Sequence, residues 1–308
     1  MRYLIIGATG TMGKLVVEAL AKDPENYILG MSRDEQKIGK MPKVMNVNYT
    51  IGDIRDKSRV QSVMADDYDV VINLSALKCV DIIESNPFEA VKTNIIGSQN
   101  LIEAAEMKVN RPKIIFTSTD KAAYPINAYG QSKAIAESLY RQYRGPCTVF
   151  RYGNILGSRG SVLHKFVKQI LDSEPVSITG LYMSRFWIRD DNVCRILANE
   201  ATDLTYNNHL KIIFSKTMKI YDVAMAVSKV MGRKYDPRHY NLIGFRPGEK
   251  LHETLVANFE DYMPVLADGL NVLISKNKDH TSQEFQSYEP HEFMELIDPI
   301  VARILGEK

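Results

Sequence analysis

Short apolar runs alternate with longer segments of helical spacing through the first half of the chain. Strands are predicted where apolar and β-branched residues stand together, at residues 3–6, 27–31, 44–51, 70–74, 113–118 and 147–152. Helices are predicted between them, where apolar residues recur every three or four positions, at residues 14–20, 58–64, 87–107 and 129–143. This alternation predicts a doubly wound α/β fold, in which helices cover both faces of a parallel sheet.

The pattern loosens after residue 151. Amphipathic helices are predicted at residues 161–171 and 220–231 and a strand at residues 211–214, with polar loops between them. We therefore expect a smaller C-terminal lobe beyond the carboxyl edge of the sheet. The expected division separates residues 1–160 from residues 161–308, although the second part can return to the sheet.

Composition narrows the class of protein without identifying it. The chain has 308 residues, and its 39 lysines and arginines and 37 acidic residues are interspersed, for a net charge of +2. We therefore expect neither nucleic acid nor a membrane as a partner. No apolar run approaches the roughly 18 residues of a membrane-spanning helix. The three cysteines are widely separated and form no CxxC motif, which predicts no metal site and a cytoplasmic location.

A glycine-rich loop joins the first predicted strand to the first predicted helix. Its first glycine permits a tight turn, the second lets the backbone approach a pyrophosphate, and the third lets the helix pack against the strand. The loop predicts a Rossmann-type dinucleotide-binding domain within residues 1–160. The cofactor-binding residues expected from it are Gly7, Thr9, Gly10, Thr11, Met12 and Gly13.

Residues at the end of the second predicted strand bear on the identity of the cofactor. Arg33 can pair with a 2′-phosphate, which favours NADP, whereas Asp34 can accept from a 2′-hydroxyl, which favours NAD. Ser32 and Arg33 stand nearer the expected strand end, so we expect NADP, with NAD as the alternative. After the third strand, the segment of Asp53 and Ile54 is placed to contact the adenine, although an ordinary turn aspartate would fit there too.

A tyrosine and a lysine four residues apart carry the candidate chemistry. Tyr129 and Lys133 share one face of a predicted helix, and no other of the 16 tyrosines is followed by a lysine at that spacing. Lys133 and the positive ring of an oxidised nicotinamide are expected to lower the pKa of Tyr129 from about 10. Asp120 and Lys121 stand just upstream as a second acid and base.

The glycine loop together with Tyr129 and Lys133 resembles the extended short-chain dehydrogenase/reductase superfamily. More narrowly, residues 118–127 are similar to the signature of bacterial UDP-N-acetylglucosamine 4,6-dehydratases of capsule and pseudaminic-acid pathways. Further resemblance lies in residues 76–78, 92–94, 151–154, 157–162, 183–186 and 246–251. It implies an NADP-dependent hydro-lyase that acts on UDP-N-acetylglucosamine, with retention or inversion at the sugar C5 left open.

The resemblance also implies roles for single residues. Thr119 is expected to orient the substrate hydroxyl, while Tyr129 and Lys133 drive hydride transfer. Lys121, if its pKa is lowered, would remove the C5 proton, and Asp120, when protonated, would donate to the departing C6 hydroxyl. Further cofactor contacts are implied for Ala76, Lys78 and Asn94. Substrate contacts are implied for Lys78, Asn154, Arg159, Ser161, Arg185, Arg246 and Glu249, and the lobe is accordingly expected to bind substrate.

Two other functions fit parts of the same pattern. A UDP-sugar 4-epimerase would use Tyr129 and Lys133 but would leave Asp120 and Lys121 without a role. A non-catalytic NADP-binding sensor or regulatory protein would need the glycine loop alone. The resemblance further implies a homo-oligomer, either a dimer or a hexamer, assembled through the helices at residues 87–107 and 129–143.

Overall fold

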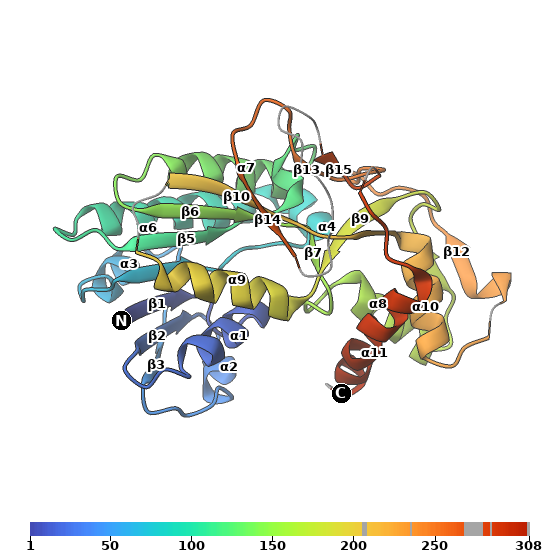
Figure 1. The fold of residues 1–308 in the computed structure, drawn as a ribbon, viewed down its shortest axis with the longest axis horizontal. Helices are drawn as coiled ribbons and strands as arrows, with labels where there is room; N and C mark the ends of the chain where they lie inside the picture. The colour runs from blue at the N-terminus through green and yellow to red at the C-terminus, as the bar shows by residue number, and fades with distance from the viewer. Residues whose placement is uncertain (205–207, 235, 268–279, 284, 307–308) are drawn as a thin grey trace.

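The computed structural model describes residues 1–204, 208–234, 236–267, 280–283 and 285–306, and its main element within these ranges is a parallel sheet of eight strands (Figure 1). The strands follow the order β14 (Met263–Leu266), β10 (Asn208–Phe214), β6 (Cys147–Arg151), β5 (Lys113–Thr117), β4 (Val70–Asn73), β1 (Arg2–Ile6), β2 (Tyr27–Ser32) and β3 (Val47–Ile51). The direction of winding reverses between β4 and β1. Ligands bind beyond the carboxyl ends of the strands at such a reversal.

Side chains of the sheet alternate between two hydrophobic layers. In β1, Leu4 and Ile6 belong to one layer and Tyr3 and Ile5 to the other, as the two-residue period of a strand requires. The first layer is covered by α3 (Lys57–Val63), α6 (Gly97–Glu106) and α7 (Ala128–Arg141), and the second by α1 (Thr11–Leu20) and α9 (Asp190–Thr202). The predicted doubly wound α/β fold is therefore confirmed.

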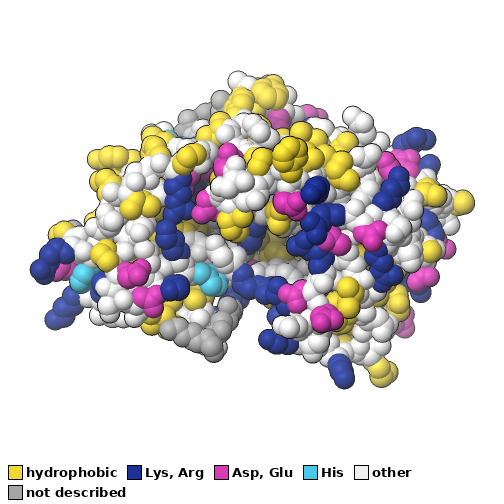
Figure 2. Space-filling model, turned by 180° about the vertical axis from the view of Figure 1, so that it is seen from behind, with side chains coloured by type: hydrophobic (Ala, Val, Ile, Leu, Met, Phe, Trp, Pro, Cys, Tyr) yellow, Lys and Arg dark blue, Asp and Glu magenta, His cyan; other side chains and the backbone are white. Residues whose placement is uncertain are grey.

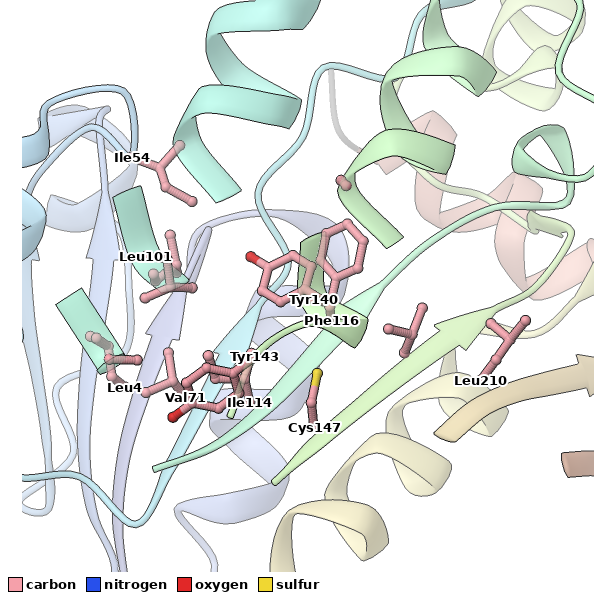
Figure 3. Packing of buried hydrophobic residues seen from close by; sticks show 14 of the residues in the cluster. Leu4, Ile54, Val71, Leu101, Ile114, Phe116, Tyr140, Tyr143, Cys147 and Leu210 are labelled. Carbon is pink, nitrogen blue, oxygen red and sulfur yellow. The ribbon is translucent and has the colours of Figure 1, made fainter. Parts of the chain in front are cut away.

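The first layer holds α7 against the sheet (Figure 3). Tyr140 of α7 stacks on Phe116 of β5 with ring centroids 4.2 Å apart, and Asn73 of β4 donates a hydrogen bond of 2.7 Å to the Tyr140 hydroxyl. Both rings are buried, and full burial of a large apolar side chain contributes about 1.5–3 kcal/mol. The start of α7, with Tyr129 and Lys133, is thereby fixed relative to the strand ends.

The single helix predicted at residues 87–107 consists of three consecutive segments. A π-helical turn, η1 (Val91–Ile96), joins α5 (Pro87–Ala90) to α6. The predicted helix is therefore confirmed over residues 87–106, and only the π-helical turn within it was not predicted, because apolar spacing does not reveal a local change in the hydrogen-bonding pattern. In this turn the buried Asn94 side chain forms two hydrogen bonds with the backbone of Leu77, at 2.9 and 3.1 Å.

The second part of the chain forms a lobe with a hydrophobic core of its own. Three helices pack with Trp187 in this core: α8 (Val162–Leu171), α10 (Ile220–Val230) and α11 (Pro290–Gly306). Its short strands pair as β7 (Asn154–Ile155) and β11 (Thr217–Lys219) on either side of β9 (Ser184–Ile188), β8 (Val176–Ile178) with β12 (Tyr240–Leu242), and β13 (Thr254–Val256) with β15 (His280–Thr281). The predicted smaller lobe is confirmed, and β10 and β14 return from this half of the chain to the main sheet.

Several boundaries differ from the predicted ones. Strand β3 begins at Val47 because the Val47 N–H donates to the Val44 carbonyl at 3.0 Å, which makes a turn of the preceding residues. Helices α9 and α11 were not predicted. Pro299 interrupts the helical pattern of α11, whereas α9 carries buried apolar residues at four-residue intervals that would have indicated it.

The short helices are α2 (Glu35–Gly39), α4 (Val80–Glu84), η2 (Asp120–Ala122) and η3 (Pro237–His239).

None of the described helices combines the length and the apolar composition that a membrane crossing requires.

Candidate active site

A cleft of about 680 Å³ lies between the carboxyl edge of the sheet and the lobe. Figure 2 shows the molecule hollowed between its two parts, with lysine and arginine side chains gathered along the hollow. The predicted residues that line the cleft are Gly7, Gly10, Thr11, Met12, Gly13, Ala76, Lys78, Thr119, Lys121, Tyr129, Lys133, Asn154, Arg159, Ser161, Arg185, Arg246 and Glu249. The predicted residues outside its lining are Thr9, Ser32, Arg33, Asp53, Ile54, Asn94 and Asp120.

The glycine loop has the shape that a dinucleotide pyrophosphate requires. Gly7 has a φ of +85°, and a Cβ on Gly13 would lie 2.3 Å from the carbonyl oxygen of Gly7. No side chain caps the start of α1, so its first N–H groups and the helix dipole are available to an anion. A hydrogen bond of 2.6 Å between Thr9 Oγ1 and Ser32 Oγ joins the loop to β2. These residues fit a nicotinamide dinucleotide.

The two candidate selectors of the cofactor differ in their partners. The Asp34 carboxylate accepts from the backbone N–H of Lys37 at 3.0 Å and lies 2.6 Å from Lys37 Nζ, and these hydrogen bonds lower the pKa of Asp34. Arg33 is half exposed, with Nη1 3.6 Å from Asp53 Oδ2. Since the Asp34 carboxylate already caps a helix, Arg33 is the more available of the two for a contact with the cofactor ribose.

The segment after β3, expected to contact the adenine, is engaged by other partners. Asp53 Oδ2 lies 2.7 Å from Arg55 Nη2, and Ile54 is buried in the first hydrophobic layer. Any contact of Asp53 with a base would compete with this ion pair.

Lys133 and Tyr129 lie together at the carboxyl end of β5. Lys133 Nζ donates a hydrogen bond of 2.6 Å to the carbonyl oxygen of Thr117 and lies 3.8 Å from the centre of the Phe116 ring. Burial lowers the pKa of Lys133 to about 7, because desolvation disfavours the ammonium. Thr119, at the end of the same strand, hydrogen-bonds the Tyr129 phenol.

The expected lowering of the Tyr129 pKa is not produced by the side chains of the protein. Burial raises the pKa of Tyr129 to about 12, although the charge of Lys121 and the hydrogen bond with Thr119 act in the opposite direction. Both Tyr129 and Lys133 are buried, so desolvation opposes both charges, and the expected lowering by Lys133 together with an oxidised nicotinamide stays a prediction.

Asp120 and Lys121 form part of a buried charge cluster. Lys121 Nζ lies 3.0 Å from Asp120 Oδ1 and 3.3 Å from Glu253 Oε1. Burial raises the pKa of Asp120, and the nearby Glu253 carboxylate adds to this. Burial alone would lower the pKa of Lys121, but the charges of Asp120 and Glu253 outweigh it and raise this pKa. The surrounding side chains therefore do not produce the lowered pKa on which the role of Lys121 as a base was made conditional.

Glu253 was missed by the sequence analysis. It follows the resembling segment 246–251 by two residues, and this proximity was the one signal that pointed to it. Its side chain is 3% exposed and faces the cleft.

The arginine side chains predicted to contact substrate lie at different depths in the cleft. Arg185 is buried, donating to the carbonyl oxygens of Ser184 at 2.7 Å and Lys250 at 2.9 Å. Arg246 stands at the cleft mouth, 3.7 Å from Asp81, and its backbone N–H donates to Glu249 at 2.9 Å. Arg185 and Arg246 thus frame the lobe side of the cleft.

The remaining predicted residues divide between the two sides. Arg159 Nη2 donates to the carbonyl oxygen of Thr9 at 2.7 Å, so this arginine reaches across the glycine loop. Asn154 Oδ1 accepts from Lys121 Nζ at 3.5 Å, and Ser161 Oγ lies 3.3 Å from His164 Nδ1. Arg159 therefore lies beside the predicted cofactor loop and also lines the cleft, and its expected contact with substrate stays a prediction.

A doubly wound sheet with a glycine loop at β1, a Tyr/Lys pair on α7 and a lobe across the strand ends defines an extended short-chain dehydrogenase/reductase. The family model described as polysaccharide biosynthesis protein matches residues 3–269, and the chain belongs to this family. The resemblance predicted from the sequence is thereby confirmed.

The relatives of this chain include proteins of two named activities. The chain is 36% identical to the UDP-N-acetylglucosamine 4,6-dehydratase (inverting) of Campylobacter jejuni, over 99% of this chain and 88% of the relative. It is also 36% identical to the UDP-glucose 4-epimerase of Rickettsia bellii, over 83% of this chain and 78% of the relative. Identity alone therefore does not separate dehydration from epimerisation.

Solved structures share the fold. Pen from Bacillus thuringiensis is 31% identical, with a TM-score of 0.84 over 96% of both chains. A dTDP-glucose 4,6-dehydratase from Streptomyces venezuelae, solved with NAD bound, has a TM-score of 0.78 at 17% identity, over 100% of this chain and 98% of that one.

Proposed function

We propose that the protein is a nucleotide-sugar 4,6-dehydratase that acts on UDP-N-acetylglucosamine. The observation that carries the proposal is the Asp120–Lys121 pair, with Nζ and Oδ1 3.0 Å apart beside Thr119 and Tyr129. Oxidation at C4 needs only Thr119 and the tyrosine and lysine on α7. A second buried acid and base suits the removal of water from C5 and C6.

A bound nicotinamide dinucleotide supplies the hydride acceptor for oxidation at C4 and the hydride donor for reduction at C6. Thr119 and Tyr129 hold the C4 hydroxyl, and Tyr129 accepts its proton. Lys133, fixed on the Thr117 carbonyl at 2.6 Å, supports the charge that develops on the phenol.

The elimination is assigned to the charge cluster. The C4 ketone acidifies the C5 proton, which passes to Lys121. Asp120, whose pKa burial raises, enters this step protonated and donates its proton to the departing C6 hydroxyl. The products of the step are a C5–C6 double bond and one water.

We assign the nucleotide sugar to the lobe side of the cleft because of the charge there. Arg185 and Arg246 are suited to diphosphate oxygens because a guanidinium binds such groups bidentately. Asn154, Ser161 and Glu249 can hydrogen-bond sugar and ribose hydroxyls from the same side. We assign Arg159 to the cofactor pyrophosphate because it lies across the glycine loop.

Incubation with UDP-N-acetylglucosamine and a catalytic amount of NADP⁺ tests the function. We expect a product lighter by one water, identified by mass spectrometry, with a C4 ketone visible by NMR. The similarity to UDP-glucose 4-epimerases makes epimerisation the second candidate. An unchanged mass with altered stereochemistry at C4 would establish that alternative, and cofactor binding without turnover would indicate a sensor.

We propose NADP as the cofactor, and Arg33→Ala tests this assignment. Loss of the half-exposed guanidinium is expected to weaken NADP binding about tenfold while leaving NAD binding nearly unchanged, because only NADP carries a 2′-phosphate. Fluorescence titration of both reduced cofactors measures the ratio. Arg144→Ala, which removes an exposed arginine paired with Glu106, is the matched control. Equal losses for both cofactors would contradict the assignment.

A further inference from the structure

Glu253 occupies a buried position in the charge cluster that faces the cleft. Its Oε1 lies 3.3 Å from Lys121 Nζ and 3.6 Å from Arg185 Nε, and its Oε2 lies 4.0 Å from Lys250 Nζ. Among the described residues, Oε2 has no hydrogen-bond partner. Burying a carboxylate oxygen without a hydrogen bond costs free energy, and the side chain is only 3% exposed. A catalytic role would explain why such an oxygen is retained.

Packing from a distant part of the chain fixes the backbone of Glu253. Its N–H donates to Ser282 Oγ at 2.9 Å, and the Ser282 N–H donates to the Glu253 carbonyl at 2.7 Å. Ser282 Oγ in turn donates to the carbonyl oxygen of Ser184 at 3.0 Å, next to Arg185. Glu253 and Arg185 are thereby held in one rigid arrangement around the Lys121 ammonium.

This arrangement creates a problem for Lys121 as a base. An ammonium cannot accept the C5 proton. With Asp120 protonated for the leaving hydroxyl, the Glu253 carboxylate at 3.3 Å is the charge that keeps Lys121 in the ammonium form. Lys121 must therefore lose one of its own protons during the elimination. Two carboxylates lie close enough to receive it, Asp120 at 3.0 Å and Glu253 at 3.3 Å.

The two carboxylates differ in charge environment. Among the described residues, Asp120 forms an ion pair with Lys121 alone. Its Oδ2 has no hydrogen-bond partner and its side chain is fully buried, so Asp120 is the better proton donor of the pair. Glu253 faces Lys121, Arg185 and Lys250, which lower its pKa against the effect of burial and keep it ionised before the reaction. Asp120 carries the proton for the leaving hydroxyl, so Glu253 is the carboxylate free to accept one.

We propose that Glu253 completes the base of the elimination by taking the proton that Lys121 must release. This proposal rests on the dehydratase function proposed above. Lys121 passes one ammonium proton to Glu253 Oε1, and its freed nitrogen lone pair takes the C5 proton as the C5–H electrons form the C5–C6 double bond. The C6–O bond breaks, and the leaving hydroxyl takes the Asp120 proton to become water. Glu253 ends neutral, Asp120 ends ionised and Lys121 ends as ammonium, so charge and protons balance.

Glu253 acts through Lys121 and does not touch the reacting carbons, so it is a positioning residue for proton transfer. Its effect should be confined to the elimination. Oxidation at C4 depends on Thr119, Tyr129 and Lys133, and none of them forms an ion pair with Glu253 among those described.

Glu253→Gln, which keeps the shape but removes the proton acceptor, tests the proposal. We expect water loss to slow about 100-fold, while the single-turnover absorbance change that reports C4 oxidation keeps its wild-type rate within about threefold. Deuterium at C5 should slow the variant more than the wild type, since removal of the C5 proton becomes rate-limiting. Glu253→Asp, which keeps a carboxylate, should recover part of the elimination rate.

Glu174→Gln is the matched control, because Glu174 is exposed and does not line the cleft, and it should behave as wild type. Water loss at the wild-type rate in Glu253→Gln would overturn the proposal, and so would equal losses of C4 oxidation and water loss. If the wild-type protein inverts C4 of the substrate without loss of water, the dehydratase function itself is refuted. This result is distinct from both outcomes for Glu253→Gln.

Discussion

Replacing Tyr129 with phenylalanine is expected to lower turnover of UDP-N-acetylglucosamine at least about 10³-fold. The substitution removes one oxygen atom and leaves the ring that packs at the start of α7. The hydrogen bond of 2.6 Å from Lys133 to the Thr117 carbonyl does not involve the phenol and should persist. Without the phenol, the proton of the C4 hydroxyl has no acceptor, so neither C4 oxidation nor any later step can proceed. Product formation followed by mass spectrometry measures the loss.

Tyr143→Phe provides the control for Tyr129→Phe. Tyr143 is also buried, and its hydroxyl donates a hydrogen bond of 2.8 Å to the carbonyl of Pro112, away from the cleft. Loss of this hydrogen bond should lower the free energy of unfolding by about 1 kcal/mol and leave turnover unchanged. Activity of Tyr129→Phe within tenfold of wild type would show that another group accepts the C4 proton.

Asp120→Asn and Lys121→Met are expected to separate the two halves of the reaction. Each should slow water loss about 10²–10⁴-fold, because each removes one proton-transfer group of the elimination. C4 oxidation should slow much less, because Thr119 and Tyr129 remain, although Lys121→Met also removes a charge that lowers the pKa of Tyr129. The variants should therefore reduce bound cofactor on mixing with substrate and then release little dehydrated product. Rapid-mixing absorbance and mass spectrometry on the same samples measure the two halves.

Lys168→Met serves as the control for the lysine, since Lys168 is exposed and pairs only with Asp172 one turn along α8 among the described residues. An epimerase predicts a different outcome, because it would leave both cluster variants close to wild-type turnover. Full dehydratase activity in Lys121→Met would eliminate Lys121 as the group that takes the C5 proton.

Burial and charge together underlie the proposed direction of proton transfer in this site. Asp120 is fully buried with one ammonium beside it, whereas Glu253 faces three cations, so the same chemical group has a raised pKa in one place and a lowered pKa in the other. Two carboxylates whose pKa values are pushed apart are a common basis for separate acid and base roles. The shared neighbour, Lys121, connects them at 3.0 and 3.3 Å.

The fold and part of the site could be predicted from sequence because their signals are local. A strand buried on both faces is a short apolar run, and a helix that begins at a glycine loop needs residues that are close in sequence, such as Gly7 and Gly13. The Tyr129 and Lys133 spacing is local in the same way, since residues four apart share a helical face. The π-turn at Asn94 escaped prediction because it changes backbone hydrogen bonding without changing the apolar pattern.

The sequence by itself determined the doubly wound sheet, the phosphate-binding loop and the types of acid and base available for chemistry. Only the tertiary structure decided that Arg159 reaches the glycine loop, that burial raises the pKa of Tyr129, and that Glu253 lies beside Lys121. Desolvation and Coulombic interactions depend on distances in space, and here they join groups that are far apart along the chain. The residue types can therefore be read from the sequence. Their protonation states and their proposed roles as acid or base depend on how the lobe packs against the sheet.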